Sequence, residues 1–195
     1  MARKTLTHDE VLRLRTETTF DQSVSDILST FDRATPSDVE AGTRWYDEAG
    51  EIAASLPGVT FEQGCAIIAH LSPRTPWARN VAGAIHFVTH NDRMEGILDA
   101  NYQRALSSLE FADPSASFNG PKTARFYWNI LGIRDVVTID VWAARVVGVT
   151  EKQLSRVGVY DALEAAYQDA ARQRGVDPAT MQASCWVVQR NGRAA

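Results

Sequence analysis

Apolar residues recur along most of the chain at intervals of three and four, the spacing that places them on one face of an α-helix. Three clear examples are the sets Ile67, Ile68 and Leu71, Val81, Ile85 and Val88, and Tyr127, Ile130 and Leu131. The best stretch typical of a β-strand, residues 135–139, is short and lies between two expected helices. The pattern predicts an all-α protein of eight or nine helices.

Helix start signals support this interpretation. In a capping box, a Ser or Thr side chain and a Glu or Gln three residues later each accept a hydrogen bond from the other's backbone N–H. The pattern occurs at Thr7–Glu10, Ser37–Glu40, Thr60–Gln63 and Thr150–Gln153. Proline is well tolerated at the first helical position, and we expect this position for Pro76, Pro121 and Pro178.

The turn-rich stretches between the expected helices are short. They lie near residues 33–36, 57–59, 72–76, 111–120, 132–138 and 175–177. None of them is long enough to separate independent domains. We therefore expect residues 1–195 to form a single helical domain, built either as one unit or as two lobes.

Composition is that of a soluble globular protein. The chain has 195 residues, of which 45% are hydrophobic and 23% charged. No run approaches the roughly 18 apolar residues that span a bilayer, and the first ten residues lack the apolar segment of a secretory signal. These features predict a soluble, cytoplasmic protein with no membrane partner, and nothing in the sequence predicts a protein partner.

Neither a metal nor a cofactor is predicted. Cys65 and Cys185 lie far apart in apolar helical patterns, which indicates buried free thiols. His86 and His90 are one helical turn apart, but no third ligand stands at a supportive spacing. The glycine-rich motifs that bind nucleotide phosphates or dinucleotides are absent as well.

The charge is unevenly distributed. The net charge of −4 and the pI near 5.6 count against nucleic-acid binding, for which a basic domain is usual. However, residues 72–93 hold three arginines against one acid, and residues 115–149 hold four bases against two acids. The middle of the chain could therefore form a local basic patch.

Chemistry is concentrated in residues 117–148. The sequence predicts a glycine-containing turn, a helix that opens at Pro121, a second turn near Gly132 and a further helix that begins near Asp140. Backbone N–H groups at such a helix start can bind a phosphate. Lys122, in the first helical turn, is a candidate nucleophile, and Asp140 could stabilise a developing cation.

This segment resembles the helix-hairpin-helix signature of the DNA glycosylase superfamily that includes endonuclease III and 8-oxoguanine glycosylase. Gly120 matches the second hairpin glycine, and residues 122–124 match its Lys-Thr-Ala. Asp140 follows Lys122 by eighteen residues, as in the family, and Arg145 stands at the family's arginine offset. Phe118 replaces the first hairpin glycine, Val-Trp replaces the Thr-His after the aspartate, and the four-cysteine cluster of the endonuclease III branch is missing.

The resemblance implies an HhH-GPD fold, with residues 117–148 as the catalytic unit, and a DNA partner. It implies an enzyme that flips a modified or damaged base and cleaves its N-glycosidic bond, with or without lyase activity. Lys122 would attack the anomeric carbon and Asp140 would stabilise the sugar cation. The implied DNA contacts in this unit are Asn119, Gly120, Thr123 and Arg145.

Two weaker resemblances indicate further candidate site residues. Residues 61–80 are similar to the family's early helix and the turn that supplies a residue to the gap left by the flipped base, which makes Arg74 a candidate DNA contact. Parts of the chain are also similar to helical proteins of bacteriophage DNA-hypermodification systems. The residues that these resemblances add are the DNA contact Asn80 and the base-pocket residues Trp77, Trp186 and Gln182, and Trp142 is a further candidate for stacking on a flipped base.

Other interpretations stay open at this point. On the same fold, the chain could be a transferase that modifies thymine or 5-hydroxymethyluracil, or a DNA-binding module without catalysis. Lys122 could be a solvated lysine, and Asp140 could only cap a helix together with Thr138. The tryptophans could pack in the core rather than stack on a base.

Overall fold

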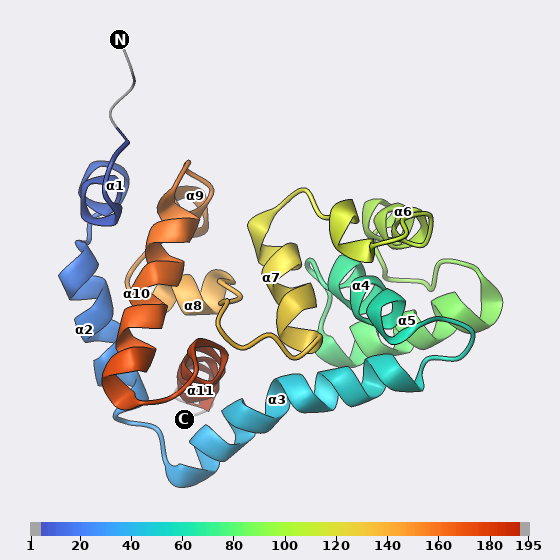
Figure 1. Cartoon of the computed structure of the whole chain (residues 1–195), viewed down its shortest axis with the longest axis horizontal. Helices are drawn as coiled ribbons and strands as arrows, with labels where there is room; N and C mark the ends of the chain where they lie inside the picture. The colour runs from blue at the N-terminus through green and yellow to red at the C-terminus, as the bar shows by residue number, and fades with distance from the viewer. Residues whose placement is uncertain (1–4, 192–195) are drawn as a thin grey trace. The chain divides into compact units, whose positions relative to one another are not determined.

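The computed structural model describes residues 5–191, in which helices are joined by turns and loops and no β-strand occurs (Figure 1). They form eleven α-helices and one 3-10 helix: α1 His8–Arg15, α2 Phe20–Phe31, α3 Pro36–Ser55, α4 Phe61–Leu71, α5 Trp77–His90, α6 Asp99–Ser108, η1 Pro114–Ser117, α7 Pro121–Ile130, α8 Val141–Val146, α9 Glu151–Leu154, α10 Val159–Arg174 and α11 Pro178–Asn191. The all-α prediction is confirmed. The helices outnumber the predicted eight or nine, and two of them, α8 and α9, have only six and four residues.

The chain divides into two compact units. The central unit is Tyr46–Ile133, and the terminal unit combines the segments before and after it, residues 5–45 and 134–191 of the described chain. The boundary near residue 45 lies inside α3, which contributes residues to both units. The predicted catalytic segment 117–148 is divided between the units at residues 133 and 134.

The terminal unit is organised around α10, which packs against α1, α2 and α11. The face of α10 that meets these helices is apolar and completely buried at Leu163 and Tyr167. Leu12 of α1 and Ile27 of α2 are buried in the same core. Burial of large side chains provides most of the stability of such helix packing.

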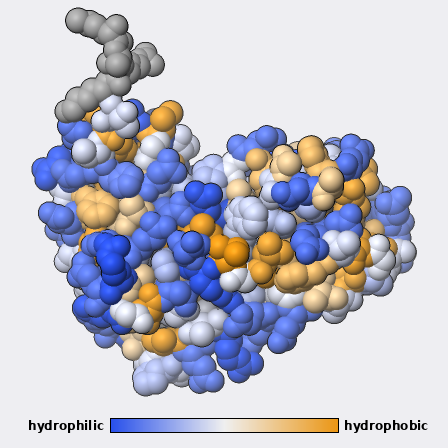
Figure 2. Space-filling view, in the orientation of Figure 1, coloured by the Kyte–Doolittle hydropathy of each residue, from blue (hydrophilic) through white to orange (hydrophobic). Residues whose placement is uncertain are grey.

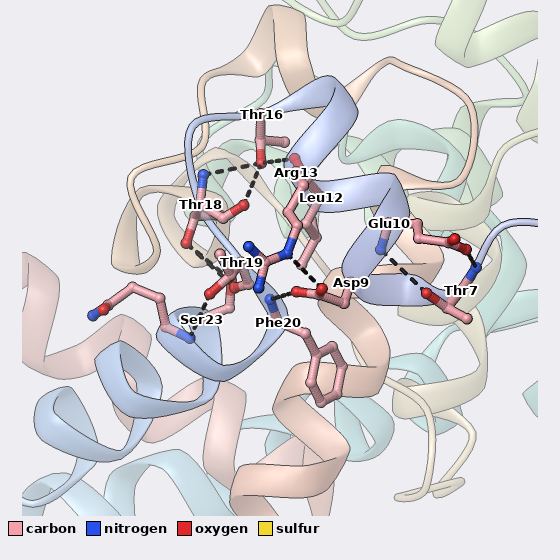
Figure 3. A network of polar contacts seen from close by, with 11 residues as sticks. Thr7, Asp9, Glu10, Leu12, Arg13, Thr16, Thr18, Thr19, Phe20 and Ser23 are labelled. Atoms are coloured by element: carbon pink, nitrogen blue, oxygen red, sulfur yellow. Dashed lines mark hydrogen bonds and ion pairs between the residues drawn. The ribbon is translucent and has the colours of Figure 1, made fainter.

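A polar network fixes the corner between α1 and α2 (Figure 3). The capping box of Thr7 and Glu10 closes the start of α1 as predicted. One carboxylate oxygen of Asp9 accepts a hydrogen bond from Arg13 Nε at 2.6 Å, and the other accepts one from Phe20 N, at the start of α2, at 3.1 Å. These two hydrogen bonds, that from Arg13 first, lower the pKa of Asp9. Asp9 thus joins the two helices.

Two further capping boxes are confirmed, at Thr60–Gln63 before α4 and at Thr150–Gln153 before α9. The box predicted at Ser37–Glu40 is wrong, because α3 already begins at Pro36. Its cap is Thr35, whose Oγ1 accepts from Asp38 N at 3.2 Å while the Asp38 carboxylate accepts from Thr35 N at 2.9 Å. A proline favours the first helical position, so the helix begins directly after Thr35.

Proline opens two of the three helices for which it was expected to do so. Helix α7 begins at Pro121 and α11 at Pro178. Pro76 instead lies one residue before α5, which begins at Trp77.

The central unit is built on α4, whose residues from Gly64 to Leu71 are all buried. This helix packs against α5, α6, α7 and η1. A Cβ at Gly64 would lie 2.4 Å from the carbonyl oxygen of Ala53 in α3, so the absence of a side chain is what allows α3 and α4 to approach.

On the face drawn in Figure 2, hydrophobic residues are scattered among hydrophilic ones. No helix within residues 5–191 is long and apolar enough to cross a bilayer.

Candidate functional site

The turn before α7 is the part of the central unit that carries the predicted chemistry. It consists of η1, the three residues from Phe118 to Gly120, and the first turn of α7. A full α-helix does not lead into this turn: α6 ends at Ser108, and only the four-residue η1 intervenes. The hairpin is therefore built differently from a simple pair of α-helices.

The turn is fixed to α4 by a buried histidine. His70 Nε2 lies 2.8 Å from Ser117 Oγ, and Ser117 Oγ donates to Pro114 O at 2.6 Å. The His70 ring also stacks on Phe118, with ring centroids 4.2 Å apart and planes 9° apart. Phe118 in turn contacts Tyr127 of α7, with centroids 5.1 Å apart. Phe118, which replaces a glycine of the family signature, is thus a packing residue that orders the turn.

His70 is neutral at ordinary pH. It is 3% exposed, and burial first, then the charge of Arg104, lowers its pKa from 6.5 to about 4. Sequence analysis did not include His70 in the site. Its only signal was an imidazole in an otherwise apolar helical stretch.

Gly120 is not required by the conformation of the turn. Its φ of −134° suits any residue, and a Cβ added there would meet nothing within 4 Å. It is the N-cap of α7, and no side chain caps this helix end. The first backbone N–H groups of α7 therefore have no side-chain cap, and the space beside Gly120 is open.

Lys122 and Thr123 lie in this first turn, and both are half-buried. Thr123 Oγ1 donates to Gly120 O at 3.4 Å, so its hydroxyl faces the cap residue. Asn119, just before the cap, is exposed.

Two sequence segments of the central unit hold basic residues and no carboxylate side chain, although Asp113 caps η1 directly before the second segment. Residues 63–91 and 114–133, which hold most of α4, all of α5 and all of α7, contain no Asp or Glu. Helix α4 packs against both α5 and α7. The four bases of these two segments are Arg74, Arg79, Lys122 and Arg125.

Asp140 lies in the terminal unit, where it caps α8. Its Oδ1 accepts hydrogen bonds from Trp142 N at 2.9 Å and Ala143 N at 2.8 Å. Tyr167 of α10 donates to Ala143 O at 3.0 Å and holds the same helix. The structure thus shows the capping role of Asp140. Because Lys122 belongs to the central unit, the pairing of Lys122 with Asp140 stays a prediction from their spacing in the sequence.

The loop after α4 presents Arg74 at its tip. Arg74 is exposed and has a φ of +59°, which is rare for a residue with a side chain. Asn101 Nδ2 donates to Pro73 O at 2.8 Å and holds the loop against α6.

Asn80, in contrast, is 1% exposed and donates from Nδ2 to Ile68 O at 3.1 Å. Asn80 thus bridges α5 and α4, and its predicted DNA contact stays a prediction.

The predicted base-pocket residues lie in both units. Trp77, at the start of α5, is in the central unit, whereas Trp142, Gln182 and Trp186 are in the terminal unit. Gln182 is buried. The other two tryptophans each carry an arginine over the ring: Arg145 lies 4.9 Å from the Trp142 centroid, and Arg190 lies 4.6 Å from that of Trp186.

The remaining candidates for chemistry are two histidines and two cysteines. His86 and His90 stack with centroids 4.4 Å apart, and no group of three metal-ligating side chains occurs among residues 5–191. Cys65 and Cys185 are free and buried as predicted. Burial is the main cause that raises the pKa of each thiol to about 12.

Comparison with known proteins complements this geometry. Neither the curated proteins nor the solved structures include a match to the chain. One family model matches residues 9–193, nearly the whole chain. The protein therefore belongs to a family of unknown function, DUF7178.

Proposed function

We propose that this protein binds DNA through the turn formed by residues 117–122 and acts on a base of the bound strand. The proposed activity is that of an N-glycosylase with the HhH-GPD fold, working in the cytoplasm. The turn holds a backbone phosphate, Lys122 is the nucleophile, and Asp140 stabilises the sugar cation.

Gly120 is the observation that carries the proposal. Neither its φ nor its packing requires glycine, and the space in front of it is open. A glycine in such a position lets another group approach the backbone closely. The uncapped N–H groups of α7, a ten-residue helix, suit an anionic group at this point, and DNA presents phosphates.

The distribution of charge supports a polyanionic ligand. Arg74, Lys122 and Arg125 belong to segments of the central unit without a single carboxylate side chain. Local positive charge of this kind attracts a phosphate backbone even when the net charge of the protein is negative.

The proposed reaction needs the target nucleotide outside the base stack, because its sugar carbon is shielded in the duplex. The Lys122 amine attacks C1′ through its nitrogen lone pair, and the bond between C1′ and the base breaks. The departing base takes the electron pair of that bond and one amine proton. As the sugar ring opens, O4′ takes the electron pair of its bond to C1′ and the second amine proton, which leaves a Schiff base between Lys122 and C1′ that water later hydrolyses. Asp140 offsets the positive charge that develops on the sugar.

The substitution Gly120→Ser tests the DNA site. Serine is a better N-cap than glycine, so the variant should be at least as stable as the wild type. Its side chain would occupy the open space, and we expect affinity for a labelled duplex oligonucleotide to fall roughly tenfold, the effect of losing one charged hydrogen bond. Unchanged affinity in a variant with an unchanged or higher Tm would contradict the proposed phosphate site.

The catalytic part has a separate test. Wild type and Lys122→Ala are incubated with borohydride and DNA that carries uracil, 5-hydroxymethyluracil, 8-oxoguanine or an abasic site. We expect base release and a trapped covalent adduct with the wild type and no adduct with the variant. If the wild type binds DNA but forms no adduct and releases no base, the glycosylase is excluded. A base-modifying transferase or a plain DNA-binding module would then replace it.

A further inference from the structure

We infer that His70 is the positioning residue of the phosphate-binding turn: it donates a hydrogen bond to Ser117 and stacks on Phe118, and so presents the α7 N–H groups to a DNA phosphate. The inference rests on the proposed function, since it assigns a residue outside the turn to that same site.

The direction of the hydrogen bonds fixes the tautomer of His70. The Ser117 hydroxyl has one proton and donates it to Pro114 O. Ser117 Oγ must therefore accept from His70, so Nε2 carries the imidazole proton. This chain of two hydrogen bonds connects α4 to both ends of η1, because Pro114 and Ser117 are its first and last residues.

The stacked rings continue the connection to α7. His70 covers one face of Phe118 with nearly parallel planes, and Phe118 contacts Tyr127. Tyr127 is fully buried and lies on the helix whose first turn carries Lys122. Movement of His70 would therefore disturb the turn on both sides of Gly120.

Packing alone does not call for histidine here. Its neighbours in the buried stretch of α4 are Gly, Cys, Ala, Ile, Ile, Ala and Leu, which fill the core without a strong hydrogen-bonding group. Burying an imidazole is unfavourable unless its N–H has a partner. That partner is Ser117, forty-seven residues away in the sequence, in the proposed DNA-binding turn.

The test separates positioning from stability with three variants. His70→Phe keeps an aromatic ring for stacking but removes the donor. His70→Gln keeps a donor at a similar reach, and Ser117→Ala removes the acceptor. His86→Phe, on α5 of the same unit, is the matched control.

DNA affinity is measured by fluorescence anisotropy with a labelled duplex oligonucleotide at several salt concentrations. For His70→Phe and Ser117→Ala we expect roughly tenfold weaker binding, the effect of losing one charged hydrogen bond. We also expect the slope of log K against log salt to shrink by about 0.9, the value for one phosphate neutralised by Lys or Arg, because the displaced turn carries Lys122. His70→Gln and His86→Phe should retain the wild-type slope. Partial unfolding alone would lower the bound fraction but leave the slope unchanged.

The outcomes distinguish the two proposals. If the wild type binds no DNA even at low salt, the proposed function fails and the role of His70 fails with it. If the wild type binds and His70→Phe shows the same affinity and slope, only the role of His70 is overturned. Equal losses of DNA affinity in His70→Phe and His70→Gln, with the wild-type salt slope in both, would also overturn the positioning role. His70 would then contribute only to packing.

Discussion

The carboxylate of Glu164, in the middle of α10, accepts a hydrogen bond from the backbone N–H of Val137 at 2.9 Å. Both residues are buried. Residues 136–139 have no neighbouring strand among the described residues, so side chains of α10 act as the partners of their backbone groups. Tyr160 completes the pairing, since its hydroxyl donates to Val137 O and accepts from Ile139 N, both at 2.9 Å. This pairing positions Asp140, the next residue.

Replacing Glu164 should therefore destabilise the terminal unit. Glu164→Ala leaves the buried Val137 N–H without an acceptor, and we expect a loss of about 1–3 kcal/mol in the free energy of unfolding. Glu164→Gln retains an acceptor oxygen of the same reach and should lose much less. Urea denaturation followed by circular dichroism measures both. Equal losses in the two variants would show that the Val137 hydrogen bond is not the cause.

This pairing also shows where prediction from sequence ends. The sequence predicted a loop near residues 132–138, and the structure has neither helix nor strand there. Its partners, however, lie more than twenty residues later on one face of a helix, and only the folded chain brings them together. By contrast, Thr60 and Gln63 cap α4 as predicted, because a capping box depends on neighbours three residues apart.

The residues of the candidate site also differ in how far they could be predicted from the sequence. Pro121 and the helix after it follow from local rules, so the position of Lys122 in a first helical turn could be predicted. The contact between His70 and Ser117 spans forty-seven residues and left no local signal. The capping box at Ser37–Glu40 was wrongly predicted for another reason. It overlaps with the cap formed by Thr35 and Asp38, and the proline at position 36 makes the helix begin directly after Thr35.

The close approach of α3 and α4 predicts a sensitive glycine. In Gly64→Ala, the new Cβ would lie 2.4 Å from Ala53 O and 3.1 Å from its carbonyl carbon, so backbone must move. We expect the central unit to lose about 1–3 kcal/mol or more, the usual effect of overpacking. Thermal unfolding measured by circular dichroism provides the comparison. A wild-type Tm would mean that the two helices separate at little energetic cost.

Both thiols should be inert in the folded protein. Burial raises the pKa of Cys65 and of Cys185 to about 12, so at pH 8 only roughly one thiol in ten thousand is a reactive thiolate. With a chromogenic disulfide reagent we expect no reaction within minutes in buffer and two equivalents in denaturant. The single variants Cys65→Ala and Cys185→Ala identify each thiol. Fast labelling of the native protein would contradict the burial of the labelled residue.

His70 predicts the pH dependence of stability. Its pKa is about 4 in the folded protein and near 6.5 in the unfolded chain, because burial and then Arg104 disfavour the imidazolium. Between these values the unfolded chain binds more protons, so stability is fully present above pH 6.5 and is lost as the pH falls towards 4. At about 1.4 kcal/mol for each pKa unit, the loss approaches about 3 kcal/mol, with about 2 kcal/mol already lost at pH 5.

The variant His70→Gln isolates this contribution. It keeps the hydrogen-bond donor but does not titrate. The acid sensitivity that remains in the variant therefore comes from other groups. One of them is Asp9, whose lowered pKa also makes stability fall as the pH falls, but at lower pH than His70. Urea denaturation of both proteins at pH 7.5 and pH 5 gives the difference directly. We expect the wild type to lose about 2 kcal/mol more than the variant over this interval. Equal losses would mean that His70 is protonated in the folded protein, and its buried, neutral state would then be wrong.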